Sequence, residues 1–208
     1  MRIGGYEQTA QSPAVHYDTV YSTDNGTEWR LDNVSAGFGD LSVDPAAPAA
    51  GIQYGGQLHY FVGGLGAWAT SDGVSWANTV NMPLWGAEGA ISHIALGIHE
   101  GWLHAAFRHP GTTTVWRSKD GMNWSPVSSA TEWGTDVDAI VSFDGSVRFI
   151  SSDLRQTISS RDGRCWSAQL LPLQFRQAYS LGGKVWGLTS SPYLGDFSLR
   201  YVVSSYNM

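Results

Sequence analysis

The stretch Thr70-Ser71-Asp72-Gly73-Val74-Ser75-Trp76 is one copy of a pattern that returns along the whole chain. The pattern reads Ser/Thr-x-Asp-(x)-Gly-x-x-Trp, and its other copies occupy residues 22–29, 118–124 and 160–166. A decayed fifth copy starts at Ser204. The Ser/Thr positions 22, 70, 118, 160 and 204 are 48, 48, 42 and 44 residues apart. An internal repeat of this length predicts an array of similar supersecondary units.

The residue types of this pattern predict a β-hairpin turn. An Asp side chain can accept a hydrogen bond from its own backbone two residues on, and Gly supplies the positive φ that a tight turn needs. An apolar residue stands two positions before each Ser/Thr, which is the period of a strand entering the turn. The Trp begins the returning strand. These roles fall on Asp24, Trp29, Asp72, Trp76, Asp120, Trp124, Asp162 and Trp166.

A second, glycine-containing turn precedes each copy. These turns are predicted at Gly4-Gly5, Gly55-Gly56, Glu100-Gly101, Asp144-Gly145 and Gly182-Gly183. Strand-like segments flank them, so each repeat holds four short antiparallel strands in about 45 residues. That length and content are typical of one β-propeller blade.

The repeated turn resembles the Asp-box, or bacterial neuraminidase repeat, of sialidase-like β-propellers. Its four matches are spread over nearly the whole chain. The resemblance implies a propeller in which this turn joins the third and outermost strands of each blade.

We therefore expect an all-β fold, a single β-propeller domain over residues 1–208 with about five four-stranded blades. The repeats cover approximately 1–35, 49–82, 89–130, 136–171 and 175–208. The first repeat lacks its innermost strand and the last lacks its outermost strand. The alternative is four blades, in which the last inner strand completes the first blade.

Composition narrows the function classes. The chain has 208 residues, 42% hydrophobic and 14% charged, with 25 Gly and 10 Trp, and its net charge is −6. No basic run occurs, so a nucleic acid partner is not expected. No apolar stretch approaches the roughly 18 residues of a membrane span, and no signal-peptide core is seen at the N-terminus. Cys165 is the single cysteine, so no intrachain disulfide is expected.

The connectors between repeats carry the candidate ligand-binding residues. Nine residues after each turn Trp stands another aromatic residue, and an acid follows in three connectors while the fourth has an arginine. In an up-and-down blade these connectors emerge on the face that also carries the loops between second and third strands. Flat rings can stack on sugars and carboxylates can accept from hydroxyls, although packing between blades would give the same spacing. The candidate residues are Phe38, Asp40, Trp85, Glu88, His109, Trp133, Asp136, Phe175, Arg176 and Tyr193.

No metal, cofactor or catalytic residue is predicted. The segment from His99 to His104 is one residue too long for HExxH and lies over a glycine turn, not on a helix. The sialidase family needs three arginines, one of them in an Arg-Ile-Pro context, with a Tyr–Glu pair and an acid Asp. Here Arg2 is followed by Ile3-Gly4, and none of the family's catalytic residues can be assigned to a position of this chain.

The sequence thus favours a non-enzymatic recognition module for glycans or adhesion, with a phage virion or tail as one setting. A purely structural or assembly protein is the first alternative, and a glycoside hydrolase-like enzyme, which needs two facing carboxylates, is the second. The expected partner is a glycan or a protein. A homo-oligomer or larger assembly through the C-terminal edge strand, residues 199–203, is a further expectation. A virion-associated or extracellular location is favoured over a cytoplasmic one.

Overall fold

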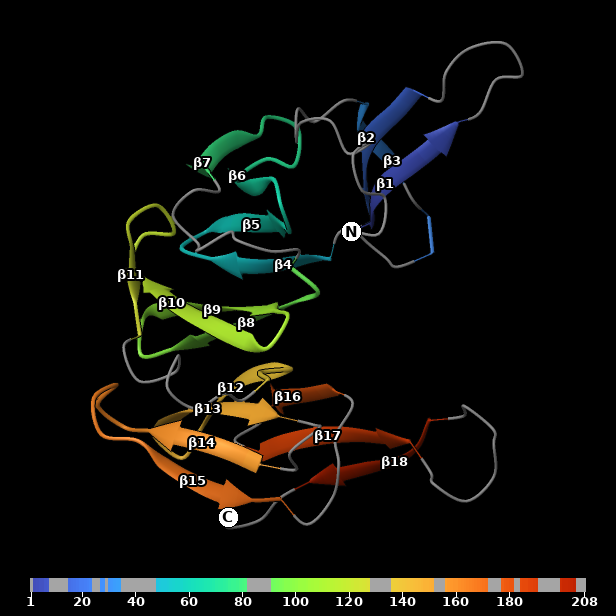
Figure 1. The fold of residues 1–208 in the computed structure, drawn as a ribbon. Coiled ribbons are helices and arrows are strands. Elements are labelled where there is room, and N and C mark those ends of the chain that lie inside the picture. The colour runs from blue at the N-terminus through green and yellow to red at the C-terminus, as the bar shows by residue number, and fades with distance from the viewer. Residues whose placement is uncertain are drawn as a thin grey trace. The chain divides into compact units, whose positions relative to one another are not determined.

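The computed structural model describes residues 2–7, 15–23, 27, 28, 30–34, 48–81, 91–127, 136–151, 156–171, 177–181, 184–190 and 199–204. Within these ranges all regular structure is β-strand, arranged in five antiparallel sheets (Figure 1). The chain divides into two compact units, Met1–Ala87 and Glu88–Met208.

The first unit contains two sheets, in which neighbouring strands follow one another along the chain. Their orders are β1-β2-β3 and β4-β5-β6-β7. The strands are β1 (Arg2–Glu7), β2 (Val15–Ser22), β3 (Arg30–Val34), β4 (Ala49–Tyr54), β5 (Gln57–Val62), β6 (Gly66–Thr70) and β7 (Ala77–Asn81).

The second unit contains three sheets of the same meander type, with orders β8-β9-β10-β11, β12-β13-β14-β15 and β16-β17-β18. The strands are β8 (His93–His99), β9 (Trp102–His109), β10 (Thr112–Ser118), β11 (Trp124–Pro126), β12 (Ala139–Phe143), β13 (Ser146–Ser151), β14 (Gln156–Ser160), β15 (Ser167–Leu170), β16 (Gln177–Leu181), β17 (Lys184–Ser190) and β18 (Leu199–Ser204).

Two-residue turns join the first two strands of the three four-stranded sheets. Gly55-Gly56, Glu100-Gly101 and Asp144-Gly145 all have positive φ at both positions. Two consecutive residues with positive φ define the type I′ turn, whose twist matches that of the flanking strands. The sequence prediction is confirmed at these three places, while Gly182-Gly183 lies outside the described residues.

The prediction of a turn at Gly4-Gly5 is wrong. Both glycines lie inside β1, which pairs with β2 from Arg2↔Tyr21 to Glu7↔Val15. The register shifts between Ile3 and Gly5, so the glycine pair accompanies a local irregularity within the strand. Glycine in a strand interior often marks such a bulge.

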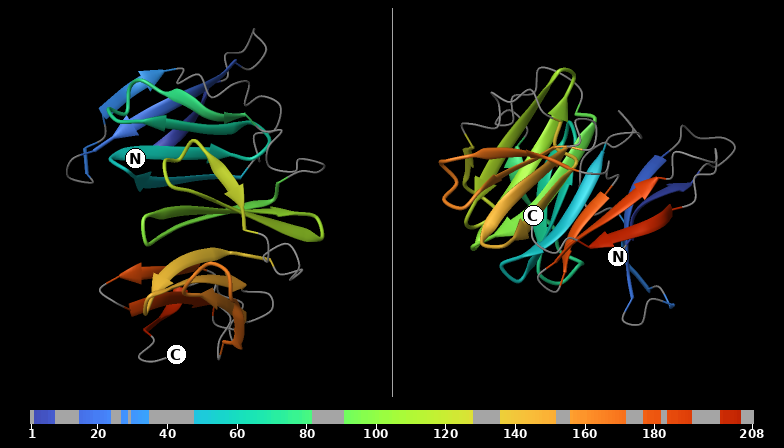
Figure 2. Two further views of the ribbon diagram at one scale, coloured as in Figure 1. Left: turned by 90° about the vertical axis from the view of Figure 1, so that its left-hand side faces the viewer. Right: turned by 90° about the horizontal axis from the view of Figure 1, so that it is seen from below.

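The sheets of the second unit pack against one another through their first strands, with β12 in contact with β8 on one side and with β16 on the other (Figure 2). Successive residues of β12 pack against different neighbouring sheets, because side chains alternate between the two faces of a strand. Ile140 belongs to a buried cluster with Ala95, Ala106 and Val115 of the preceding sheet. Val141 belongs to a cluster with Ala178 and Val185 of the following sheet. A sheet with apolar residues on both faces needs a neighbour on each side, as a propeller blade does.

The fold class predicted from the sequence is confirmed. The described chain is all-β and built from antiparallel meander sheets, with three sheets of four strands and, at the two ends of the series, sheets of three. Each of the five sheets falls within one predicted repeat. No helix of the described residues is long and apolar enough to cross a membrane.

Candidate functional site

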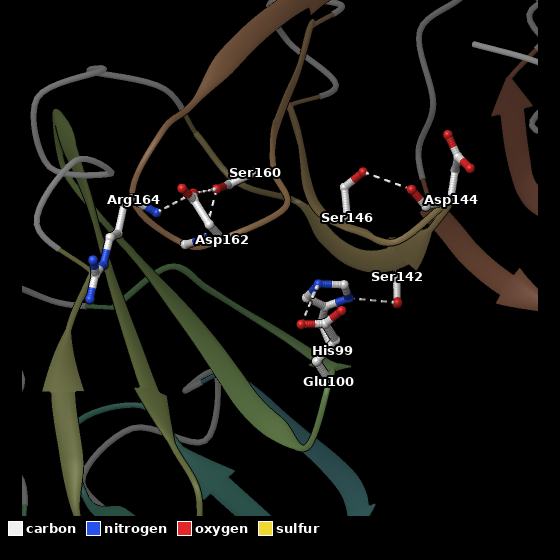
Figure 3. Close-up of polar contacts among 9 residues, drawn as sticks. His99, Glu100, Ser142, Asp144, Ser146, Ser160, Asp162 and Arg164 are labelled. Atoms are coloured by element: carbon white, nitrogen blue, oxygen red, sulfur yellow. Dashed lines mark hydrogen bonds and ion pairs between the residues drawn. The ribbon is translucent and has the colours of Figure 1, made fainter.

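The repeated turns have one hydrogen-bonding scheme in the three copies that the structure describes. In the copy at Asp72, the Thr70 hydroxyl donates to Asp72 Oδ1 at 2.9 Å and accepts from the Gly73 N–H at 2.9 Å. The same Oδ1 atom accepts from the backbone N–H groups of Val74 and Ser75, each at 2.8 Å. Equivalent bonds form in the copies at Asp120 and Asp162, and Figure 3 shows the latter with Ser160 and Arg164.

These bonds stabilise the ionised carboxylates. The N–H groups of Ser75 and Val74 and the Thr70 hydroxyl lower the pKa of Asp72 to about 2. The N–H groups of Cys165 and Arg164 lower the pKa of Asp162 to about 2. Backbone and side-chain bonds from Asn123 are the main reason that the pKa of Asp120 also falls below its usual value. Because each of these carboxylates stabilises its own turn, its position in the repeat has a structural explanation that does not involve a ligand.

The tryptophans that end the repeated turns contact the turn backbone or a neighbouring strand. The indole N–H groups of Trp76 and Trp124 donate to the carbonyls of Gly73 and Gly121, at 3.2 and 3.1 Å. Trp166 stacks on Phe149, with ring centroids 5.1 Å apart. Asp24 and Trp29, of the first copy, lie outside the described residues.

Most of the proposed ligand-binding residues also lie outside the described ranges. They are Phe38, Asp40, Trp85, Glu88, Trp133, Phe175, Arg176 and Tyr193. The two that the structure describes are His109, at the end of β9, and Asp136, shortly before β12. The structure therefore shows the surroundings of these two candidate residues.

Asp136 lies in a three-residue ion cluster with Arg108 and Asp138, here named the Arg108 cluster. Nε of Arg108 is 3.6 Å from Oδ1 of Asp136. Nη2 of Arg108 donates to Oδ1 of Asp138. The side chains are 22%, 35% and 13% exposed for Arg108, Asp136 and Asp138. The cluster is thus partly open to solvent, and Asp136 is its most exposed member.

Backbone bonds hold this cluster between two sheets. The Asp138 N–H donates to the Ile150 carbonyl at 2.8 Å, and the Asp138 carbonyl lies 3.1 Å from Nε2 of His93 on β8. The Ser92 N–H donates to the Arg108 carbonyl at 2.8 Å. Arg108 and Asp138 are 30 residues apart, and they meet because β9 and the start of β12 belong to neighbouring sheets of the second unit.

His109 does not join its sequence neighbour in this cluster. Its side chain is buried, 5% exposed, and Nε2 lies 3.4 Å from the Thr114 hydroxyl of β10. Consecutive strand residues point to opposite faces of a sheet. The His109 side chain therefore lies on the opposite face of the sheet from Arg108, where it is buried and presents little surface to a ligand.

Arg108 and Asp138 were not among the candidate residues from the sequence. Two signals were available for them. Asp136 and Asp138 are two positions apart, the spacing that puts extended residues on one side, and Arg108 directly precedes His109, which the sequence predicts to lie in a loop on the connector side. Nothing in the sequence says that these segments meet.

A second polar group lies at the other end of β8 and β12 (Figure 3). Nδ1 of His99 lies 2.9 Å from the Ser142 hydroxyl, and Nε2 lies 4.0 Å from a Glu100 oxygen. Next to it, His104 is 4% exposed, with its ring edge-on to Phe149 at 6.1 Å. Burial is the main cause that lowers the pKa of His104 to about 4, and the nearby His99 and Arg117 add to it.

The described residues contain no group of three or more His, Cys, Asp and Glu side chains placed to hold a metal ion. The partly exposed charges of the Arg108 cluster can instead exchange hydrogen bonds with a polar ligand. The buried histidines lie between sheets, where they bear on stability.

Comparisons with known proteins give only distant structural similarity. No family model matches the chain, and no curated protein sequence matches it. Among solved structures, a mutant of the NanB sialidase from Streptococcus pneumoniae is similar with a TM-score of 0.43 and 14% identity, over 91% of this chain. A nidogen/laminin complex is similar with a TM-score of 0.37 and 10% identity, over 89% of this chain and 84% of that chain. The present chain spans 28% of the length of the sialidase chain.

Proposed function

We propose that this chain is a non-enzymatic recognition module of the Asp-box β-propeller type, and that the face predicted to carry the connector residues, among them Trp85, Trp133 and Asp136, binds glycans. We name it the connector face. The Arg108 cluster is the observation that carries the proposal. It is a partly exposed set of charged side chains at the strand ends from which the connectors emerge.

The chemistry of the cluster suits a ligand rich in hydroxyl groups. Carboxylate oxygens of Asp136 and Asp138 accept hydrogen bonds, and the guanidinium of Arg108 donates them. Charge-assisted hydrogen bonds of this kind are stronger than neutral ones. Trp133, three residues before Asp136, is the aromatic residue of the same connector, and an aromatic ring supplies a stacking surface for a sugar.

Each connector repeats this combination of an aromatic and a polar residue, so the module offers several similar weak sites. Repeated sites on one protein raise the overall affinity by avidity without any new contact. Adhesion to a polysaccharide surface is the use to which such an arrangement is suited. A component of a phage virion or tail is one setting for it.

A second candidate function, an assembly protein, is favoured by the edges of the two three-stranded sheets. Within the described residues, β1 and β18 each pair on one side. A strand edge with unpaired backbone groups recruits further strands. In that case the partner is a protein strand, and no glycan binds.

Binding of the full chain to a glycan array separates the two functions. The array is followed by titration and melting of Trp85→Ala and Trp133→Ala with the strongest glycan. If these tryptophans are platforms, both variants keep the melting temperature of the wild type and lose affinity. If they are wedges between blades, each loses about 3–5 kcal/mol of stability instead, and binding falls only with unfolding.

A further inference from the structure

We infer that the Arg108 cluster makes the connector face select neutral glycans over anionic ones. The inference rests on the proposed function and names the chemical class of its ligand. It depends on the contacts that the charged groups of the cluster already make with one another.

Arg108 is the cation of the cluster, and two carboxylates share it. Its Nη2 donates to Asp138, which is 13% exposed, and its Nε faces Asp136 at 3.6 Å. With both Asp residues ionised the cluster has one net negative charge. An incoming carboxylate or sulfate would meet this net negative charge at Asp136, the most exposed member of the cluster.

Backbone bonds hold Asp138 and Arg108 in this arrangement. Asp138 donates its N–H to Ile150 and accepts at its carbonyl from His93, so its backbone is fixed to both sheets. The Arg108 carbonyl is fixed by the Ser92 N–H. Asp136, the most exposed member, then stands at the surface as an acceptor. Acceptors at the surface suit sugar hydroxyls and repel sugar acids.

The chain provides a matched control for this argument. Asp144 lies at the other end of β12, in the β12–β13 turn, and its Oδ2 is 3.6 Å from Nη2 of Arg161. This distance equals that of the Arg108–Asp136 pair. Asp144→Asn therefore changes the net charge of the chain as Asp136→Asn does, and it also removes one arm of an arginine–carboxylate pair, away from the cluster.

The test is an array that pairs each neutral oligosaccharide with its sialylated or uronate counterpart. Wild type, Asp136→Asn and Asp144→Asn are compared on it. We expect the wild type to bind neutral members more strongly. Asp136→Asn should narrow that preference by about tenfold, the size of one charge interaction at a partly exposed site. Asp144→Asn should leave the preference as it is.

A second measurement needs no variant. Raising the salt concentration from 50 to 300 mM screens the repulsion, so wild-type binding to the acidic members should rise relative to the neutral ones. Preference of the wild type for acidic glycans, or equal shifts in the two variants, would overturn the inference and leave glycan recognition intact. Absence of binding to every glycan would overturn the proposed function and the inference together.

Discussion

Replacing His104 by glutamine should abolish most of the loss of stability that the wild-type chain undergoes as the pH falls from 6.5 to 4. His104 is 4% exposed, packs edge-on to Phe149, and is faced by His99 from β8 and Arg117 from β10. Glu100 near His99, and Lys119 beside Trp102, are further charged groups of this region. A proton on His104 would add charge to a layer from which water is excluded.

The size of the effect follows from the two pKa values of His104. The ordinary value is 6.5, and burial lowers the pKa to about 4 in the folded chain. As the pH falls below 6.5 the unfolded chain takes up the proton first, which favours unfolding. The contribution of His104 is thus fully present above pH 6.5 and is lost as the pH falls to about 4. At 1.36 kcal/mol per pH unit the loss is about 3 kcal/mol.

Urea unfolding followed by tryptophan fluorescence, at several pH values from 7.5 to 4, measures this. The wild-type free energy of unfolding should fall steeply over this range, with some of the fall due to His59, whose pKa burial also lowers. His104→Gln should flatten the fall by about 3 kcal/mol. Phe149→Leu is the matched control, since it loosens the packing beside His104 but keeps the imidazole, and it should lower stability equally at every pH. An unchanged slope in His104→Gln would refute the reasoning.

Three further predictions concern the turns, the packing of sheets and a strand edge. Asp120→Ala should lower the free energy of unfolding by about 1–2 kcal/mol in urea titrations, because three N–H donors lose their acceptor at an exposed site, and glycan binding should persist. Gly97→Ala should cost about 1–3 kcal/mol, since its Cβ would come within 2.6 Å of Ile140. Gly51→Ala, where the nearest atom is 3.6 Å away, should change the melting temperature little. In hydrogen exchange, residues 199–203 should be protected in the native assembly if another strand covers β18. Rapid exchange there would exclude such a partner.

Turn chemistry made much of the fold predictable from the sequence. The Asp-Gly-x-x-Trp turns and the glycine-containing two-residue turns fix local backbone conformation, and local conformation is what residue types predict. Where a glycine pair had no such role, at Gly4-Gly5, the same reasoning failed, because pairing of β1 with β2 continues through it. Local sequence does not distinguish a turn glycine from one at a bulge.

The candidate site was less predictable, for two physical reasons. The Arg108 cluster joins residues 30 positions apart through the packing of two sheets, and no local pattern encodes that contact. No pattern in the sequence indicated that His104 is buried. Every residue from Leu103 to Phe107 is buried, so this part of β9 lacks the alternation of buried and exposed positions that identifies an inner face.

Titration of the full chain with the strongest neutral glycan of the array, followed by chromatography of the recovered glycan, tests the central claim most directly. We expect saturable binding that weakens in Trp85→Ala or Trp133→Ala, with the glycan recovered at its original length. No saturable binding to any glycan, or recovery of shortened products, would contradict a non-enzymatic glycan-recognition module.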